Sequence, residues 1–493
     1  MRPANGSGYR RDAPSGWHFR AWTHELIWEA NGADTRPLRI FRGLVRRLRL
    51  ALLCLHASVR SRAARRRSSS GPCFTWNSHR QDNTGLRRRD PKKACVASVG
   101  AATRSCHSLG NVLIGDAVVI DRGGLDQLIS SLAGRGYRVL GPVVRDQAIS
   151  VGEVHGTDDL PRGWHDTQAP GRYRLEQGND PALFSWAVGQ HSIKGDVFPS
   201  RSIVWRANVT DGTVQLEETR DDTPPTALVG ARPCELAALD VLGHVLSDAP
   251  GPDPVYRRRR AGFVVVVECA TPSGTCFCAS MGTGPASEEG FDLALTELLD
   301  GDGHRFVVRV GSDKGAEVLD GLSSRAATDS DLAARTALVE HAASNMGRHL
   351  DTNDLPALLA RNLEHPRWDD VAERCLACGN CTLVCPTCFC ATVEDTTDID
   401  GAVVRQRLWA SCFDLAHSFM SGGGPVRSSA KSRYRQWMTH KLSTWWDQFG
   451  ASGCVGCGRC ITWCPVGIDI TEEAAAIRAG DGNVRSEARR VGA

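Results

Sequence analysis

The sequence lacks a long apolar stretch and a complete nucleotide-binding motif. Its best apolar run, Leu50–Leu55, is far shorter than the roughly 20 apolar residues of a membrane-spanning helix, so we expect no membrane span. It has neither a full Gly-x-Gly-x-x-Gly fingerprint nor a P-loop lysine, and Gly282-x-Gly284 alone is too weak to indicate a nucleotide site.

Cysteine is plentiful, but its distribution does not fit a disulfide-bonded secreted scaffold. Such scaffolds are short, whereas 493 residues give room for two or three domains with cores of their own. Many of the 19 cysteines are separated by only two or three residues. This spacing favours metal binding over disulfides.

Charge divides the chain in two. Residues 1–107 carry 22 Lys and Arg against 6 Asp and Glu, a balance of +16, whereas residues 108–493 carry 37 against 50, a balance of −13. We interpret residues 1–107 as a basic extension of low order that is not part of the working fold. A disordered basic tail and a real domain are the alternatives.

Residues 108–350 show the pattern of an α/β (α+β) domain, because predicted strands alternate with predicted helices. Apolar and β-branched runs predict strands over 118–120, 137–144, 226–229 and 263–267, and helices over 125–133 and 234–246. Residues 329–363 are predicted to be rich in helix and lead into a third domain, residues 351–493.

Two copies of one cysteine pattern lie in that third domain: Cys375-x2-Cys378-x2-Cys381-x3-Cys385-Pro386 and Cys454-x2-Cys457-x2-Cys460-x3-Cys464-Pro465. In this bacterial pattern three thiolates bind one [4Fe–4S] cluster and the fourth binds the other cluster. Two-residue gaps let one loop wrap three corners of a cube, while the later cysteine points away. The pattern predicts a first cluster on Cys375, Cys378, Cys381 and Cys464, and a second on Cys454, Cys457, Cys460 and Cys385.

Zinc knuckles also use Cys-x2-Cys pairs, but zinc has no use for the third step or the Cys-Pro ending. A tethered pair of clusters that share ligand loops indicates electron transfer by one-electron hops. Two purely structural clusters are the alternative.

A long insertion, residues 386–453, separates the two motifs and favours a mainly α-helical dicluster ferredoxin domain. A helix is predicted over 433–449, and its Trp437, Trp445 and Trp446 are interpreted as core residues. Additional cysteines also lie here. Cys388, Cys390 and Cys412 could adjust a potential, ligate further iron or be free buried thiols.

Several segments resemble one known family. They are Gly230–Leu239, Cys269 with Gly274–Pro285, and the two cysteine motifs. Over roughly residues 112–480 the chain resembles the beta subunit of cytoplasmic nickel–iron sulfhydrogenases, and equally the corresponding iron–sulfur subunit of anaerobic sulfite reductase. Lys194–Pro199 is similar to a Lys-x-Phe-Leu-Phe-Pro element of the family but has Gly195-Asp196 in place of its more apolar residues.

The resemblance implies a cytoplasmic electron-transfer subunit of a soluble complex. Its partners would be a flavin- and NAD(P)-binding diaphorase subunit and the small and large subunits of a NiFe hydrogenase, or the catalytic subunit of a sulfite reductase. No nickel ligand set is found near the termini. A sulfur or disulfide reductase that acts through the surplus thiols is a further alternative. A regulator that binds nucleic acid through the basic head is disfavoured.

A third metal site is predicted in the middle domain. Cys234 follows a predicted strand and opens a helix, where the helix dipole favours a thiolate. Cys269 ends the strand over 263–267, and Cys276 and Cys278 lie in the next loop. If the two strands are neighbours, these four thiols meet at one sheet edge and could bind a further iron–sulfur cluster. The tight Cys276-x-Cys278 spacing argues against this, and two of the thiols could simply be buried apolar groups.

Overall fold

The computed structural model describes residues 18–22, 25–29, 112–210, 213–218, 221–248, 252–260, 262–301, 303–399 and 401–491. Its contacts divide the chain into two units, residues 1–101 and 102–493. In the first unit β1 (His18–Trp22) pairs antiparallel with β2 (Glu25–Glu29). The low-order extension expected over residues 1–107 falls mostly outside the described residues.

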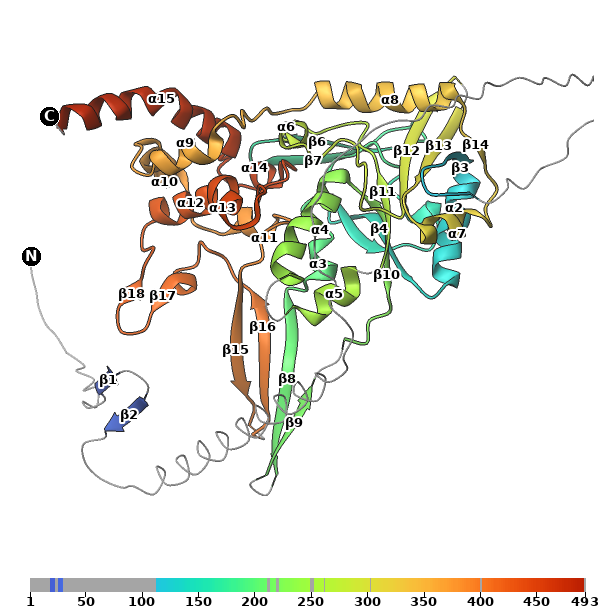
Figure 1. Ribbon diagram of the computed structural model, residues 1–493. Coiled ribbons are helices and arrows are strands. Elements are labelled where there is room, and N and C mark those ends of the chain that lie inside the picture. Colours follow the sequence, from blue (N-terminus) through green and yellow to red (C-terminus); the bar gives the residue numbers. More distant parts are fainter. Residues whose placement is uncertain are drawn as a thin grey trace, which may run out of the picture. The chain divides into compact units, whose positions relative to one another are not determined.

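The second unit is built on an eight-stranded mixed sheet (Figure 1). β4, β10, β11 and β12 are parallel neighbours, and antiparallel strands extend the sheet on both sides. The spatial order is β14 (Arg325–Ala326), β3 (Ala117–Asp121), β13 (Gly303–Val310), β12 (Leu293–Asp300), β11 (Phe263–Val267), β10 (Thr226–Ala231), β4 (Arg138–Arg145) and β5 (Ala148–Glu153).

Helices cover both faces of this sheet, as expected for strands that are apolar on both sides. On one face α2 (Arg122–Gly134) and α7 (Asp313–Leu319) pack in one apolar core, and on the other α4 (Pro233–Leu246) and α5 (Pro254–Arg260) pack in a second. The predicted alternation of strands and helices is confirmed. The remaining elements of this region are η1 (Thr157–Asp159), β6 (Trp164–Ala169), β7 (Arg172–Gln177), α3 (Lys194–Val197), α6 (Cys278–Met281) and α8 (Asp329–Ser344).

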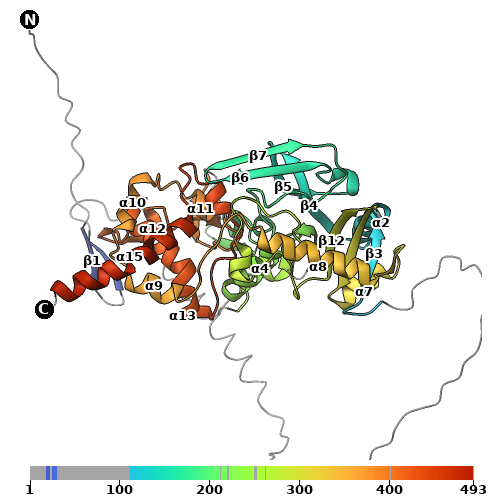
Figure 2. The same cartoon turned by 90° about the horizontal axis from the view of Figure 1, so that it is seen from above.

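The C-terminal region contains a group of helices around a separate apolar core. Figure 2 shows α9, α10, α12 and α15 side by side, and these helices contact one another. The helices are α9 (Leu355–Arg361), α10 (Arg367–Arg374), α11 (Asn380–Leu383), α12 (Ala430–Thr439), the π-helical segment η3 (His440–Thr444), α13 (Trp445–Phe449), α14 (Arg459–Thr462) and α15 (Ile470–Val491).

The insertion between the motifs also forms strands, which the prediction of a mainly helical domain did not include. β15 (Ala391–Thr397) and β16 (Val403–Trp409) join β8 (Arg201–Thr210) and β9 (Thr213–Glu218) in a four-stranded sheet. The insertion also holds η2 (Ala416–Ser418), β17 (Phe419–Met420) and β18 (Gly424–Pro425). Among the described residues no helix is both long and apolar enough to cross a membrane.

The predicted helix over 433–449 is present as α12, η3 and α13 in succession. Trp437 and Trp445 are buried, as predicted for core residues. Trp446 is 48% exposed, so its interpretation as a core residue is wrong.

Candidate metal centre

Each cysteine motif contains a short helix that presents its third cysteine. Cys381 lies in α11, directly after Gly379 and Asn380, and Cys460 lies in α14, which Gly458 precedes. Gly458 has a φ of +73°, and a Cβ there would lie 2.4 Å from the carbonyl oxygen of Thr275. Only glycine combines this left-handed backbone with so close an approach. The second motif is therefore held tightly against the middle region.

The first predicted ligand set meets in one cavity. Its wall contains Cys375, Cys378 and Cys381 from the first motif together with Cys464 from the second, and Cys460 of the second motif also reaches it. Apolar and aromatic side chains close the rest of the wall, among them Phe413, Tyr434, Trp437, Ile468 and Ile470. The structure thus brings the last cysteine of one motif to the first three of the other, as a ligand exchange requires. That these residues bind iron stays a prediction.

The second predicted set, Cys385, Cys454, Cys457 and Cys460, also gathers in the interior. Burial raises the pKa of Cys454 to about 12, against the lowering effect of the Lys441 charge and with smaller contributions from Cys385 and Cys457. Burial likewise raises the pKa of Cys460, with contributions from Cys454, Cys457 and Cys385. Thiols packed this closely stay protonated unless cations neutralise their thiolates. Iron ions of a cluster supply that neutralisation.

Backbone amides point at the sulfurs of both sets. The N–H of Ala377 donates to Cys375 Sγ at 3.4 Å, and the N–H of Ile468 donates to Cys464 Sγ at 3.3 Å. In the second set the N–H of Gly456 donates to Cys454 Sγ at 3.5 Å. Such N–H donors stabilise negative charge on sulfur, so these backbones suit thiolate ligands.

Orphaned polar atoms provide a test of whether a cluster fits the first set. The hydroxyl of Tyr434 and the indole N–H of Trp437 are buried and have no hydrogen-bond partner in the protein. Both side chains line the cavity with the four cysteines. A buried donor without an acceptor is costly, and the sulfur atoms of a bound cluster are acceptors. The residues therefore fit a [4Fe–4S] group.

A single metal ion and a cubane place different demands on the spacing of their ligands. Among the described residues no group of three or more His, Cys, Asp or Glu side chains closes around one point as a single metal ion needs. A zinc ion draws its thiolates to about 2.3 Å from one centre. A cubane offers a separate iron to each thiolate, so its ligands stand farther apart.

Two buried lysines, which the sequence analysis did not single out as site residues, lie beside Cys385. Lys441, in the π-helical segment η3, donates from Nζ to Cys385 Sγ at 3.2 Å, to Thr387 Oγ1 at 2.9 Å and to the carbonyl of Gly453 at 3.3 Å. Lys194 donates to the carbonyls of Leu383 and Cys388, both at 3.2 Å. Segments of π-helix occur often at functional sites.

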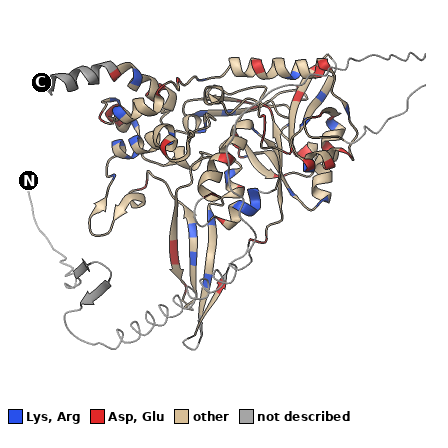
Figure 3. Ribbon diagram, viewed as in Figure 1, with Lys and Arg blue, Asp and Glu red and all other residues tan. Residues whose placement is uncertain are grey.

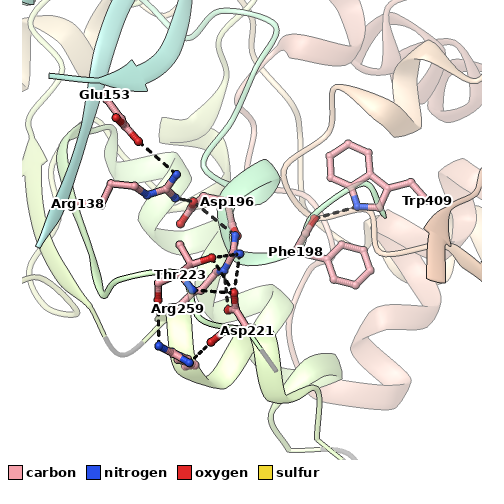
Figure 4. A network of polar contacts seen from close by, with 9 residues as sticks. Arg138, Glu153, Asp196, Phe198, Asp221, Thr223, Arg259 and Trp409 are labelled. Atoms are coloured by element: carbon pink, nitrogen blue, oxygen red, sulfur yellow. Dashed lines mark hydrogen bonds and ion pairs between the residues drawn. The ribbon is translucent and has the colours of Figure 1, made fainter. Parts of the chain in front are cut away.

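Salt bridges fix the short helix that carries Lys194 (Figure 4). Asp196 pairs with Arg138 and with Arg259, and Arg259 also binds Asp221 through Nε at 3.0 Å. Arg259 is one of four consecutive arginines in α5, a concentration of positive charge visible in Figure 3. Asp196, the second residue of the Gly195-Asp196 departure from the family element, thus anchors α3.

Trp409 also contacts Lys194. Its indole N–H donates to the carbonyl of Phe198 at 2.9 Å (Figure 4). The Lys194 ammonium lies 3.9 Å from the centre of the Trp409 ring. The desolvated ammonium interacts favourably with the aromatic face. Residues from the middle region and from the insertion therefore position this cation together.

The four cysteines of the predicted third site lie near one another and near the second set. β10 and β11 are parallel neighbours, as the prediction required. Burial raises the pKa of Cys234, with further contributions from Cys278 and Cys457, and raises that of Cys276 to about 12, with a contribution from Cys269. Cys276 Sγ lies 3.9 Å from the carbonyl of Cys457. Metal binding here stays a prediction.

The surplus thiols of the insertion line a different cavity. Cys388, Cys390 and Cys412 share its wall with His417, Arg427, His440 and Lys441, and its volume is about 770 Å³. A hydrogen bond from Cys412 lowers the pKa of Cys390 to about 6. Of the two thiols, Cys390 is therefore the one that loses its proton more readily.

Comparison with known proteins agrees with these sites. A family described as a 4Fe-4S dicluster domain matches residues 374–468, which contain both cysteine motifs. Sulfhydrogenase 2 subunit beta from Pyrococcus furiosus is 35% identical over 261 residues, which cover 51% of this chain and 74% of that protein. The chain belongs to the sulfhydrogenase beta-subunit family. As a member of this family it is an iron–sulfur protein with [4Fe–4S] clusters as cofactors. No solved structure matches the chain.

Proposed function

We propose that the chain is the electron-transfer subunit of a hydrogenase-type complex. In this proposal it carries electrons through two [4Fe–4S] clusters between a flavin- and NAD(P)-binding diaphorase subunit and the small and large subunits of a NiFe hydrogenase, in the cytoplasm. Membership of the sulfhydrogenase beta-subunit family supports this assignment and favours it over a sulfite reductase subunit.

The observation that carries the proposal is that the last cysteine of each motif lies near the first three cysteines of the other motif. Cys464 lines the cavity formed by the first three cysteines of the first motif, and Cys385 lies with Cys454, Cys457 and Cys460. We assign Cys375, Cys378, Cys381 and Cys464 to the first cluster and the other four to the second. Exchanged ligands keep two clusters close, which one-electron hopping requires.

The surrounding residues have roles that follow from their contacts. Helices α10 to α12, α14 and α15 would enclose the clusters as a helical dicluster domain, residues 351–493, beside an α/β domain, residues 108–350. Tyr434, Trp437 and Phe413 would keep water from the first set, because they close its cavity.

The third site would extend this chain of centres. Cys234, Cys269, Cys276 and Cys278 would bind a third cluster next to the second one, and the 3.9 Å approach of Cys276 Sγ to the Cys457 carbonyl supports this placement. A third centre on the middle region would carry electrons toward a partner subunit.

Iron analysis and isolation of the complex test the proposal. The full chain, reconstituted without oxygen, is expected to hold about eight irons, or about twelve with the third site filled. A tagged chain is expected to co-purify with hydrogenase and diaphorase subunits. A colourless protein that holds zinc instead, or a chain isolated from its source without either partner, would contradict the proposal.

The cavity of surplus thiols supports a second candidate function, the reduction of sulfur or disulfides. Cys390 could attack a sulfur–sulfur bond, and Cys412 could release the product by forming a disulfide with Cys390, which two electrons from the clusters would then reduce. Disulfide reduction by the loaded chain with a chemical electron donor, lost in Cys390→Ser and in Cys412→Ser, would support this function. Unchanged activity in both variants would exclude it.

A further inference from the structure

The two buried lysines beside Cys385 have no carboxylate partner. Lys194 is 2% exposed and Lys441 is 4% exposed, and within the described residues neither forms an ion pair with Asp or Glu. Their hydrogen-bond acceptors are neutral oxygens and the Cys385 sulfur. By contrast, buried Arg459 pairs with Glu235 at 2.6 Å.

A buried ammonium without a counter-ion is costly, because water no longer solvates it. Among the described residues that accept a hydrogen bond from Lys441, Cys385 is the one that can carry a negative charge. A [4Fe–4S] cluster on four cysteine thiolates is anionic in its common oxidation states, so it supplies the counter-charge that the protein lacks. The lysines therefore belong to the electrostatics of the cluster that uses Cys385.

Within the part of the chain that the structure describes, no lysine or arginine donates a hydrogen bond to a sulfur of the first ligand set. Its direct donors are the backbone amides of Ala377 and Ile468, and its cavity wall carries the neutral groups of Tyr434 and Trp437. The charge of Arg433 reaches Cys375, but its guanidinium donates to the carbonyls of Arg427 and Ser428, at 3.1 and 2.9 Å. Positive charge is thus placed unequally between the two sets.

We propose that Lys441 raises the reduction potential of the cluster held by Cys385, Cys454, Cys457 and Cys460 above that of its neighbour, so that an electron on the pair resides mainly there. This inference rests on the proposed function. A one-electron reduction adds negative charge without breaking a bond. A cation hydrogen-bonded to a ligand sulfur stabilises that charge strongly in a low-dielectric interior.

Lys194 also raises the reduction potential of this cluster in our proposal. Its Nζ donates to the carbonyls of Leu383 and Cys388, which flank Cys385 in the chain. It does not contact the sulfur itself, so its effect on the potential is smaller than that of Lys441. Asp196 anchors the helix that carries Lys194, and the Trp409 ring lies against its ammonium.

Redox titration of the reconstituted full chain, monitored by EPR, tests the inference. In Lys441→Met one of the two reduction steps is expected to move to a more negative potential while the other stays unchanged. The moved step must be the one that disappears in Cys454→Ala. Lys441→Gln keeps an N–H donor without the charge, so a smaller shift in the same direction is expected.

Lys431→Met is the matched control, because Lys431 lies in α12, which leads directly into η3, and pairs with Asp369 at the surface. It should move neither step. If Lys441→Met does not load iron, Lys441→Gln and Lys194→Met carry the test. Unchanged potentials in the loaded variants, or equal shifts of both steps, overturn the inference. A wild-type chain without two clusters would instead defeat the proposed function.

Discussion

The two ligand sets are built from the same motif, yet their surroundings differ. The first set lies in an apolar cavity whose polar groups are neutral. In the second set the buried Lys441 donates to Cys385 Sγ, and the charge of the buried Arg459 acts on Cys457. Identical cysteine spacing therefore does not make two equivalent clusters, because potentials depend on nearby charge and hydrogen bonds as well as on ligands.

The largest expected effect concerns the exchanged cysteines, which decide whether two separate sets exist. Cys464→Ala should remove about four irons and the same reduction step that Cys378→Ala removes, because both side chains line the first cavity. Iron analysis and redox titration measure this. If Cys464→Ala instead removed the step lost in Cys454→Ala, each motif would hold its own cluster and the comparison would fail.

The next largest effect concerns Arg459, one of the buried cations near the second ligand set. Its guanidinium pairs with Glu235 at 2.6 Å and donates to the carbonyl of Gly189 at 2.7 Å. Arg459→Met leaves a buried carboxylate unpaired, so the free energy of unfolding in urea should fall by about 3–5 kcal/mol.

Arg435→Met is the control for this change, because Arg435 pairs with the 80% exposed Glu364. It should cost only about 0–1 kcal/mol. If both variants lost similar amounts of unfolding free energy, the buried Arg459–Glu235 pair would contribute no more to stability than an exposed pair.

A smaller effect is expected from the anchor of Lys194. Asp196→Asn removes the carboxylate that binds Arg138 and Arg259, at a cost of about 1–3 kcal/mol. Because α3 then holds Lys194 less firmly, the potential of the second cluster alone should fall slightly. Asp395→Asn, at an exposed pair with Arg405, is the control. A shift of the first cluster in Asp196→Asn would argue against a local effect.

The smallest expected effect concerns the neutral polar groups around the first ligand set. Tyr434→Phe deletes one hydroxyl from the wall of the first cavity, so the first cluster alone should become harder to reduce, with a change in stability below about 1.5 kcal/mol. Tyr256→Phe removes a buried hydroxyl bound to the Leu239 carbonyl, far from this cavity in the chain. It should leave both potentials unchanged. An unmoved potential in Tyr434→Phe would show that the hydroxyl has no acceptor on the cluster.

Local pattern predicted the parts of the fold whose apolar residues are periodic or continuous. The predicted strand over 263–267 coincides with β11, and the predicted helix over 234–246 with α4 except at its first residue. The strands β15 and β16 had no such signal. All seven residues of β15 are exposed, and β16 pairs with β8, about 200 residues earlier in the chain.

Local sequence pattern also predicted only part of the candidate site. Cysteine spacing could suggest both ligand sets, because ligation requires a fixed order of residues. Lys441 could not be recognised as a site residue, because a lysine in a predicted helix is normally on the surface. In the structure it lies in the π-helical segment η3 and is buried. Lys194 lay in a segment already noted as unusual, but its contacts are with residues about 190 positions later.

The close fit of the second motif against the middle region has a consequence for biosynthesis. A Cβ at Gly456 would lie 2.7 Å from the backbone of Cys278, and Thr462 Oγ1 lies 2.7 Å from Thr275 Oγ1. The surface that receives the motif is translated some 180 residues before the motif itself. We therefore expect the middle region to fold on the ribosome first and to template the second loop as it emerges, so that cluster insertion completes only after the whole chain is made.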